Sequence, residues 1–228
     1  MASKLIFSVA LTIATSGALA QSKFDGTYGQ IGIGYEGISP SVSSNDVQYS
    51  GNGGVSVPVS LSANNSNSFT GVITAGYMAS VNQSFLLGMG AEYSPIKGRN
   101  TNYSVNLSGS PLLSGSYNKE YYYNIFISPA APIGSDGLIY GKFGYTGMLI
   151  KDSIAGSSTN TNFSGFSLGA GYKQIIDGSL YGFVEGNYLF YGNHTFSDSS
   201  TVSGNTVTTS FTARADTYNL LLGIGYKF

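Results

Sequence analysis

The sequence contains no cysteine, few charged residues and, beyond its first twenty residues, no long apolar stretch. Without cysteine, disulfides and thiolate metal sites are excluded. Charged residues make up 9% of the chain, which is little for a soluble surface but suits a wall that is half exposed to lipid. The net charge of −1 and the absence of any Lys/Arg run give no reason to expect a nucleic-acid partner. A transmembrane helix needs about 20 apolar residues, so beyond those twenty residues this chain could cross a membrane only as a closed barrel.

The first twenty residues have the pattern of a secretory signal peptide. Lys4 supplies a positive charge, the segment LIFSVALTIA is a short apolar run, and Ala18-Leu19-Ala20 is a small-x-small cleavage site. The apolar run is too short, and wrongly flanked, for a membrane-spanning helix. We therefore predict a signal peptide over residues 1–20 and a mature, exported domain over residues 21–228.

The last eleven residues, YNLLLGIGYKF, alternate between large apolar side chains and mostly small or polar ones. A period of two is typical of a β-strand, because successive side chains leave on opposite faces. An apolar face with tyrosines, opposite a glycine-rich face, is better explained by contact with lipid than by a soluble core. This ending resembles the assembly signal of bacterial outer-membrane barrels. The residues that carry the resemblance are Tyr218, Leu220, Leu222, Ile224, Tyr226 and Phe228.

A tyrosine with a glycine or other small residue one or two positions before it recurs near the ends of alternating stretches. The instances are Tyr35, Tyr77, Tyr93, Tyr145, Tyr172, Tyr188 and Tyr226. Short and long intervals between them alternate, as expected when a tight turn follows one strand and a long loop follows the next. The longest interval, between Tyr93 and Tyr145, hides one further strand. The pattern predicts eight strands, at residues 26–37, 68–79, 84–95, 116–128, 137–150, 163–175, 179–191 and 211–228.

The predicted connections are of two kinds. Those at 81–83, 132–136 and 177–178 are short and contain turn residues, whereas those at 38–67, 96–115, 151–162 and 192–210 are long and rich in Ser, Asn, Thr and Gly. This asymmetry is typical of outer-membrane barrels. We predict an all-β fold: an eight-stranded antiparallel up-and-down transmembrane β-barrel over residues 21–228. The mature chain resembles the small barrels of the OmpA-like and opacity-protein porin families, which implies the outer membrane of a Gram-negative bacterium. We expect no peptidoglycan-binding domain of the kind that OmpA-type proteins carry, because the eight predicted strands leave no segment for it.

Strand parity places several charged side chains opposite the tyrosines and therefore inside the barrel. The predicted lumen polar cluster is Glu92, Glu120, Lys142 and Glu185, and Glu36, Lys173 and Lys227 face inward nearer the rims. A charge on the lipid face near the midplane would cost about 2–4 kcal/mol, so this sorting supports the barrel. Two interpretations stay open: an interior that conducts or binds a solute, and the favoured one, paired groups that fill a narrow barrel. Three acids against one central base would also leave room for a bound cation.

Catalytic chemistry has weak support in the sequence. An enzyme would combine His194, the only histidine, with Ser197 or Ser199 and Glu185, as lipid A deacylases and acyltransferases on small barrels use His, Ser and an acid. The parity of His194 and Ser197 does not favour this set, and a single histidine is a poor metal site. The alternating glycines open no helix, so they indicate close packing rather than phosphate binding. We expect no enzyme activity, no cofactor and no metal.

The long loops are the remaining candidates for a function. Within 38–67, Val55, Val57, Val59 and Leu61 alternate with polar residues or proline, which predicts a strand or hairpin that projects above the membrane. We expect a structural or surface-interaction (adhesin-like) role, with an extracellular ligand bound through loops 38–67 and 192–210. The alternative is a narrow porin that passes small solutes or ions. The other expected partners are outer-membrane lipid, the barrel-assembly machinery and periplasmic chaperones.

Overall fold

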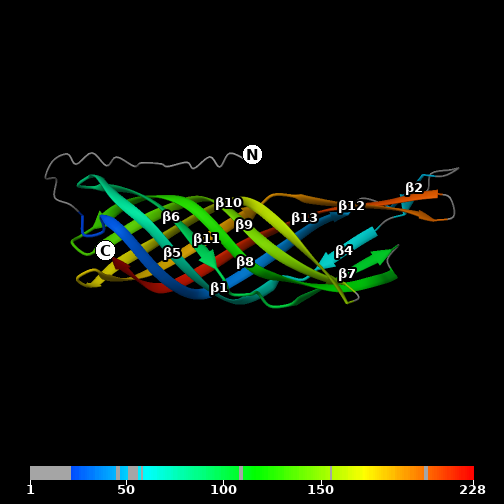
Figure 1. Cartoon of the computed structure of the whole chain (residues 1–228), viewed down its shortest axis with the longest axis horizontal. Helices are drawn as coiled ribbons and strands as arrows, with labels where there is room; N and C mark the ends of the chain where they lie inside the picture. The colour runs from blue at the N-terminus through cyan, green and yellow to red at the C-terminus, as the bar shows by residue number, and fades with distance from the viewer. Residues whose placement is uncertain are drawn as a thin grey trace, which may run out of the picture.

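The computed structural model describes residues 22–44, 47–50, 56–57, 59–107, 110–154, 156–202 and 205–228, so the predicted signal peptide lies outside it. These residues form thirteen antiparallel strands and contain no helix long and apolar enough to cross a membrane (Figure 1). The strands are β1 (Gly26–Ser44), β2 (Val47–Ser50), β3 (Ser56–Val57), β4 (Val59–Ala63), β5 (Ser66–Asn82), β6 (Phe85–Ser94), β7 (Thr101–Leu107), β8 (Ser110–Ile133), β9 (Gly137–Ile154), β10 (Ser157–Asp177), β11 (Leu180–Tyr191), β12 (His194–Val202) and β13 (Asn205–Lys227).

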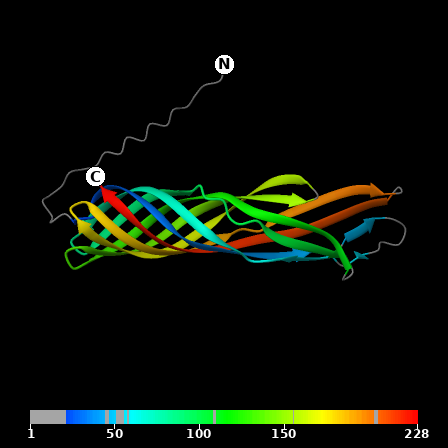
Figure 2. The same cartoon turned by 90° about the horizontal axis from the view of Figure 1, so that it is seen from below.

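Eight of the described strands close into a ring in the order β1-β5-β6-β8-β9-β10-β11-β13. The ring is completed by an antiparallel ladder between β1 and β13, which runs from Tyr28↔Lys227 to Ser44↔Phe211. Ring neighbours follow one another along the chain, so the topology is up-and-down. The predicted fold class is confirmed. Figures 1 and 2 show the tilted strands of the ring at one end of a long molecule and their extensions at the other.

The short connections lie together at one end of the barrel, called the turn end below. Turns occupy residues 83–84, 134–136 and 178–179, and each overlaps its predicted position. Gly134 and Gly178 have φ values of 65° and 53°, in the left-handed region that glycine tolerates best. The last residue lies at the same end, where the Phe228 N–H donates to the Thr27 carbonyl at 2.9 Å.

At the opposite, loop end, the strands run far beyond their predicted limits. β8, β13 and β10 contain 24, 23 and 21 residues, whereas a tilted strand crosses a membrane with about 9–11. The predicted loops are therefore largely strand: β2, β3, β4, β7 and β12 lie within them, and the ends of β9 and β10 take up most of 151–162. Their Ser, Thr and Asn residues continue the ladder of backbone hydrogen bonds, as in Thr195↔Thr212 between β12 and β13. Val57, Val59 and Leu61 fall in β3 and β4, and Val55 lies outside the described residues.

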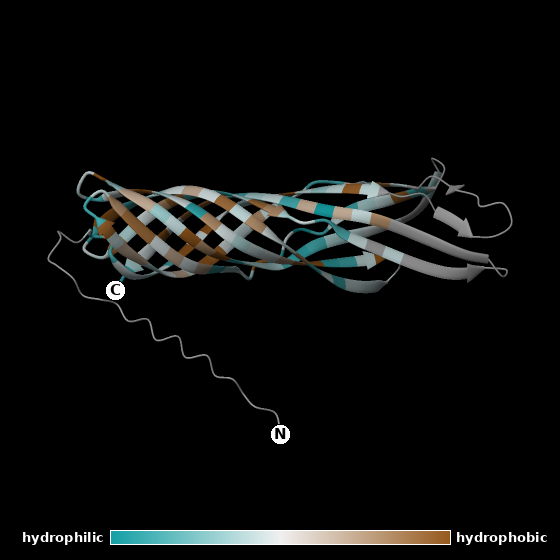
Figure 3. Cartoon of the chain, turned by 90° about the horizontal axis from the view of Figure 1, so that it is seen from above, coloured by the Kyte–Doolittle hydropathy of each residue, from teal (hydrophilic) through white to brown (hydrophobic). Residues whose placement is uncertain are grey.

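The barrel wall exposes apolar side chains on its outer face. Along β13, Leu222 is 61% exposed while its neighbour Leu221 is 2% exposed. The six residues of the predicted assembly signal are all exposed, from Tyr218 at 46% to Phe228 at 76%. So continuous an apolar surface is unusual on a soluble protein, and Figure 3 places the hydrophobic residues mainly in the barrel half of the molecule. Toward the loop end this surface finishes in an outer belt of exposed tyrosines: Tyr35, Tyr93, Tyr123, Tyr145, Tyr188 and Tyr218.

Candidate functional site

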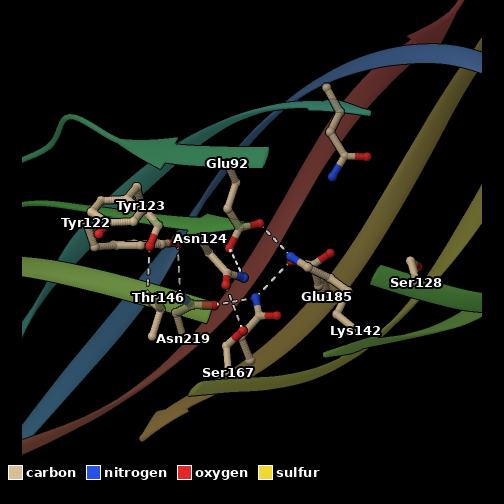
Figure 4. Close-up of polar contacts among 12 residues, drawn as sticks. Glu92, Tyr122, Tyr123, Asn124, Ser128, Lys142, Thr146, Ser167, Glu185 and Asn219 are labelled. Atoms are coloured by element: carbon tan, nitrogen blue, oxygen red, sulfur yellow. Dashed lines mark hydrogen bonds and ion pairs between the residues drawn. The ribbon is translucent and has the colours of Figure 1, made fainter. Parts of the chain in front are cut away.

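Three charged side chains from three strands meet in the barrel interior (Figure 4). Lys142 on β9 lies between Glu92 on β6 and Glu185 on β11: its Nζ is 2.5 Å from Glu92 Oε2 and 2.8 Å from Glu185 Oε1. The three side chains are no more than 2% exposed. We call Glu92, Lys142 and Glu185 the lumen triad. Each belongs to the inward-facing set of its strand, since the neighbouring residues Tyr93, Phe143 and Val184 face outward.

Neutral donors complete the coordination of the two carboxylates. Asn124 Nδ2 donates to Glu92 Oε1 at 3.2 Å. The Tyr140 hydroxyl donates to Glu185 Oε2 at 2.7 Å, and Asn187 Nδ2 donates to Glu185 Oε1 at 2.8 Å. Every carboxylate oxygen of the lumen triad therefore has a partner, which is the condition for burying two charges beside one ammonium.

The network continues across the interior through amides and hydroxyls. Asn187 Nδ2 also donates to Asn219 Oδ1 at 2.9 Å, and Asn219 Nδ2 donates to the Tyr122 hydroxyl at 3.3 Å. The Ser167 hydroxyl donates to Asn124 Oδ1 at 2.8 Å. These contacts link β8, β10, β11 and β13, so the polar groups tie opposite walls of the barrel together (Figure 4).

Glu120 does not join the lumen triad, contrary to the sequence prediction. The β8–β9 register shifts between Lys119 and Tyr121, and this bulge turns Glu120 outward. Its carboxylate lies 2.5 Å from the ammonium of Lys97, a side chain that is 69% exposed. Lys119 takes the inward position instead and is fully buried. Parity counted from a tyrosine cannot find a bulge, and so it selected the wrong neighbour.

Lys119 forms a second buried ion pair in the interior. Its Nζ lies 2.6 Å from Glu36 Oε1, and both side chains are at most 1% exposed. The Lys119 ammonium also lies 5.0 Å from the centre of the Tyr122 ring. Glu36, expected near a rim, is therefore part of the packed interior.

Lys173 is buried toward the turn end without a carboxylate partner among the described residues. Its Nζ instead lies 3.9 Å from the centre of the Tyr28 ring, 4.9 Å from that of Tyr181 and 5.2 Å from that of Tyr140. Ring faces attract a desolvated cation. The cavity beside this group, lined in part by Lys227, has a volume of about 10 Å³, which is room for about one water molecule.

The charges buried between the described walls of the barrel balance. On the strands of the ring they are three carboxylates, Glu36, Glu92 and Glu185, and three ammonium groups, Lys119, Lys142 and Lys173. A further buried carboxylate, Asp25, lies outside this set, just before β1 at the turn end, where it accepts a hydrogen bond from the Ser80 N–H at 2.7 Å. The excess of acid expected from the sequence came from counting Glu120 inside and Lys119 outside. The reason to expect a bound cation is thereby removed, and no group of three metal-ligating side chains occurs among the described residues.

The residues of the catalytic alternative are not brought together. Glu185 pairs with Leu221 of β13, and His194 pairs with Ala213 of the same strand. The two are therefore separated by eight positions along β13, roughly 27 Å at the rise of a strand. His194 packs edge-on against the ring of Phe163. Ser197 lies further along β12, opposite Ser210, and the side chain of Ser199 is outside the described set.

Comparisons with known proteins indicate the fold of this chain but not its family. No protein-family model matches the chain, and no curated protein matches it in sequence. Among solved structures, the outer membrane protein OprG from Pseudomonas aeruginosa is similar, with a TM-score of 0.56 and 14% identity over 91% of this chain and 99% of OprG.

Two further solved structures share the architecture. Neisserial surface protein A has a TM-score of 0.50 and 14% identity, covering 91% of this chain and 99% of its own. The outer membrane protease OmpT from Escherichia coli also has a TM-score of 0.50 and 14% identity, covering 92% of this chain and 99% of its own. At such low identity these matches establish the fold, that of outer-membrane β-barrel proteins, and not the role.

Proposed function

We propose that this chain is a closed outer-membrane barrel of a Gram-negative bacterium, whose extended strands present a surface outside the cell. The observation that carries the proposal is the lumen triad, because a buried and fully coordinated ion network crosses the space that a solute would need. An eight-stranded barrel has an interior just wide enough for its own side chains. For such a barrel we propose a structural or surface-interacting role, without catalysis.

Two features support the membrane location and the orientation. The outer face is apolar up to the outer belt of tyrosines, which suits a hydrocarbon layer bounded by headgroups. Short turns face the periplasm in barrels of this kind, and long connections face outward. With the predicted signal peptide and the C-terminal pattern ending at Phe228, this favours outer-membrane lipid, the barrel-assembly machinery and periplasmic chaperones as partners.

A narrow porin is the second candidate, and the polar character of the interior is the observation that favours it. Conduction would require Lys142 to leave two carboxylates that it contacts at 2.5 and 2.8 Å. Breaking such a buried contact costs about 3–5 kcal/mol. The open state would therefore be rare, roughly one molecule in a hundred or fewer.

Display of the loop end can be tested by labelling, because the chain has no cysteine of its own. Single variants Ser114→Cys, on β8 at the loop end, and Ser84→Cys, in a turn, place exposed thiols at opposite ends. A membrane-impermeant maleimide added to intact cells should label the first variant only, and both after the outer membrane is permeabilised. Labelling of the turn variant in intact cells would overturn the orientation.

The surface role can be tested with cells that express the chain with residues 38–67 or 192–210 shortened. We expect weaker cell–cell aggregation and weaker adhesion to surfaces than with the full chain. Slower migration after boiling in SDS must first establish that each shortened chain still folds as a barrel. Unchanged adhesion with both shortened forms would contradict a role for these segments.

A further inference from the structure

Residues 22–25, directly before β1, lie at the turn end of the barrel (Figure 1). We call them the N-terminal cap. The Asp25 N–H donates to the Ser22 carbonyl at 3.0 Å, and the Phe24 N–H donates to the Ser22 hydroxyl at 3.3 Å. Gly26, which joins the cap to β1, has a φ of 124°, a value that glycine adopts more readily than other residues. The cap therefore forms a turn of its own before the strand begins.

Polar contacts tie the N-terminal cap to two separate parts of the ring. The Ser80 N–H, near the end of β5, donates to Asp25 Oδ2 at 2.7 Å, and the Ser22 N–H donates to the Ser80 hydroxyl at 3.4 Å. The Lys23 ammonium lies 2.6 Å from Asp136 Oδ1, in the turn between β8 and β9. Because β5 is a neighbour of neither β8 nor β9 in the ring, the cap extends from one part of the wall across to another.

Phe24 is the apolar centre of the N-terminal cap. It is 6% exposed, and its ring packs edge-on against that of Tyr181 on β11, with 6.3 Å between the ring centres. It belongs to the hydrophobic cluster of the interior, together with Met78 on β5 and Leu138 on β9. The same residues line one small cavity with Phe24. Side chains from three strands therefore pack around an aromatic ring that comes from outside the strands, and this ring fills the mouth of the barrel.

The N-terminal cap covers the buried ammonium of Lys173. Phe24 and Lys173 line the same cavity, whose volume of about 10 Å³ leaves room for about one water molecule. A buried charge is costly without hydration or a charged partner, so an open turn end would let water reach Lys173. The cap is also distant from the lumen triad: Leu138, beside the cap, is four residues before Lys142 on β9, which is roughly 13 Å along a strand.

We propose that the N-terminal cap is a second closure of the barrel, which seals the turn end independently of the lumen triad. Phe24 excludes water and solutes from the interior, and the contacts of Lys23 and Asp25 hold it in place. The two closures differ in chemistry, because the lumen triad uses buried charges of the wall and the cap uses an apolar side chain from a segment before the wall. The inference deepens the closed barrel of the proposed function and rests on its filled interior, but not on the orientation or the surface role.

The test measures the reactivity of a thiol beneath the cap, because the chain contains no cysteine. Met78→Cys places a buried thiol in the cavity lining beside Phe24. The mature protein is refolded in detergent micelles and treated with a small, negatively charged methanethiosulfonate, which the neighbouring Lys173 and Lys227 attract. We expect slow reaction in the chain with its cap intact, and a rate that is roughly tenfold higher or more when Phe24→Ala is added.

Three controls separate an opening at the turn end from a general loosening of the barrel. Phe24→Leu keeps an apolar side chain in the mouth and should leave the Met78→Cys thiol slow to react. Ser94→Cys is fully buried on β6, two residues beyond Glu92 toward the loop end, and should stay slow when Phe24→Ala is added. Ser84→Cys is exposed in a turn and should react rapidly in every background. Slower migration after boiling in SDS verifies that each variant has folded.

Two results would overturn the proposal. One is an equal rate at the Met78→Cys thiol with Phe24 and with Phe24→Ala, and the other is an equal rise at Ser94→Cys, which would show that the whole barrel loosens. Deletion of residues 22–24 should raise the Met78→Cys rate at least as much as Phe24→Ala, and the point variant decides if the shortened chain does not fold. Failure of the proposed function gives a different result, because Ser94→Cys would then react rapidly while the cap is intact.

Discussion

Replacing Lys142 by Met is the sharpest test of the packed interior. Methionine keeps most of the length of the lysine side chain and removes the ammonium. Two buried carboxylates, Glu92 and Glu185, would remain without their shared cation. Their neutral donors from Asn124, Tyr140 and Asn187 would still be present. Any decrease in the free energy of unfolding therefore reports the removal of the Lys142 ammonium.

The magnitude follows from the geometry. The two carboxylate oxygens contact one nitrogen at 2.5 and 2.8 Å, so they lie within about 5 Å of each other. At an effective dielectric constant of about 20, two like charges at that distance repel by roughly 3 kcal/mol. Removing one partner of a buried ion pair costs about 3–5 kcal/mol in other proteins. We therefore expect Lys142→Met to lower the free energy of unfolding by about 3–5 kcal/mol.

The assay is reversible urea unfolding of the mature protein in lipid vesicles, with the free energy of unfolding taken from the linear dependence on urea. Lys97→Met is the matched control, because its ammonium also contacts a carboxylate but is 69% exposed, and such pairs contribute about 0–1 kcal/mol. Adding Glu92→Gln and Glu185→Gln to Lys142→Met should restore most of the loss. An effect of Lys142→Met no larger than that of the control, or no rescue in the triple variant, would refute the reasoning.

Three further predictions concern the wall, a turn and the C-terminus. Gly223→Val should lower the free energy of unfolding in the same assay by about 1–3 kcal/mol, because the added Cβ would meet a β1 carbonyl oxygen and an aromatic ring. Gly186→Ala is the control and should be tolerated, because no atom lies within 4 Å of the position that its Cβ would take. The hydrogen bond from Lys23 holds the pKa of Asp136 below its ordinary value, so the stability this pair contributes is lost as pH falls through that lowered pKa. Lys23→Gln should remove most of this pH-dependent contribution and raise the Asp136 pKa toward its ordinary value in a carboxyl NMR titration; an unchanged pKa would contradict this. Removing Phe228 should slow insertion in cells but not refolding in vitro, measured by heat-modifiable migration; equal rates in cells would exclude it from an assembly signal.

Most of the ring could be predicted because lipid contact leaves a strong period of two in the sequence. Ile31, Ile33 and Tyr35 on β1 alternate with small or polar residues, as Leu220, Leu222 and Ile224 do on β13. The ends of the strands could not be predicted in this way. Beyond the outer belt both faces of a strand meet water, so Ser, Thr and Asn occur on either side and the period vanishes.

The interior was predicted only where parity stayed regular. Glu92, Lys142 and Glu185 follow it, and the structure brings them together. Lys119 faces the interior in place of Glu120 because of a β-bulge, and no residue type in the sequence indicates where this bulge lies. The ring of tyrosines around Lys173 comes from three different strands, and only their packing across the interior makes it visible.

The central claim is that the barrel interior is filled and does not conduct. It is tested most directly by single-channel conductance of the refolded mature protein in a planar bilayer. A variant with Glu92→Gln and Glu185→Gln is measured beside it, and insertion is shown separately by heat-modifiable migration. We predict a silent bilayer for the wild-type chain, because Lys142 and its carboxylates fill the interior. Reproducible conductance steps, with an ion selectivity that shifts in the variant, would contradict the account and establish a pore.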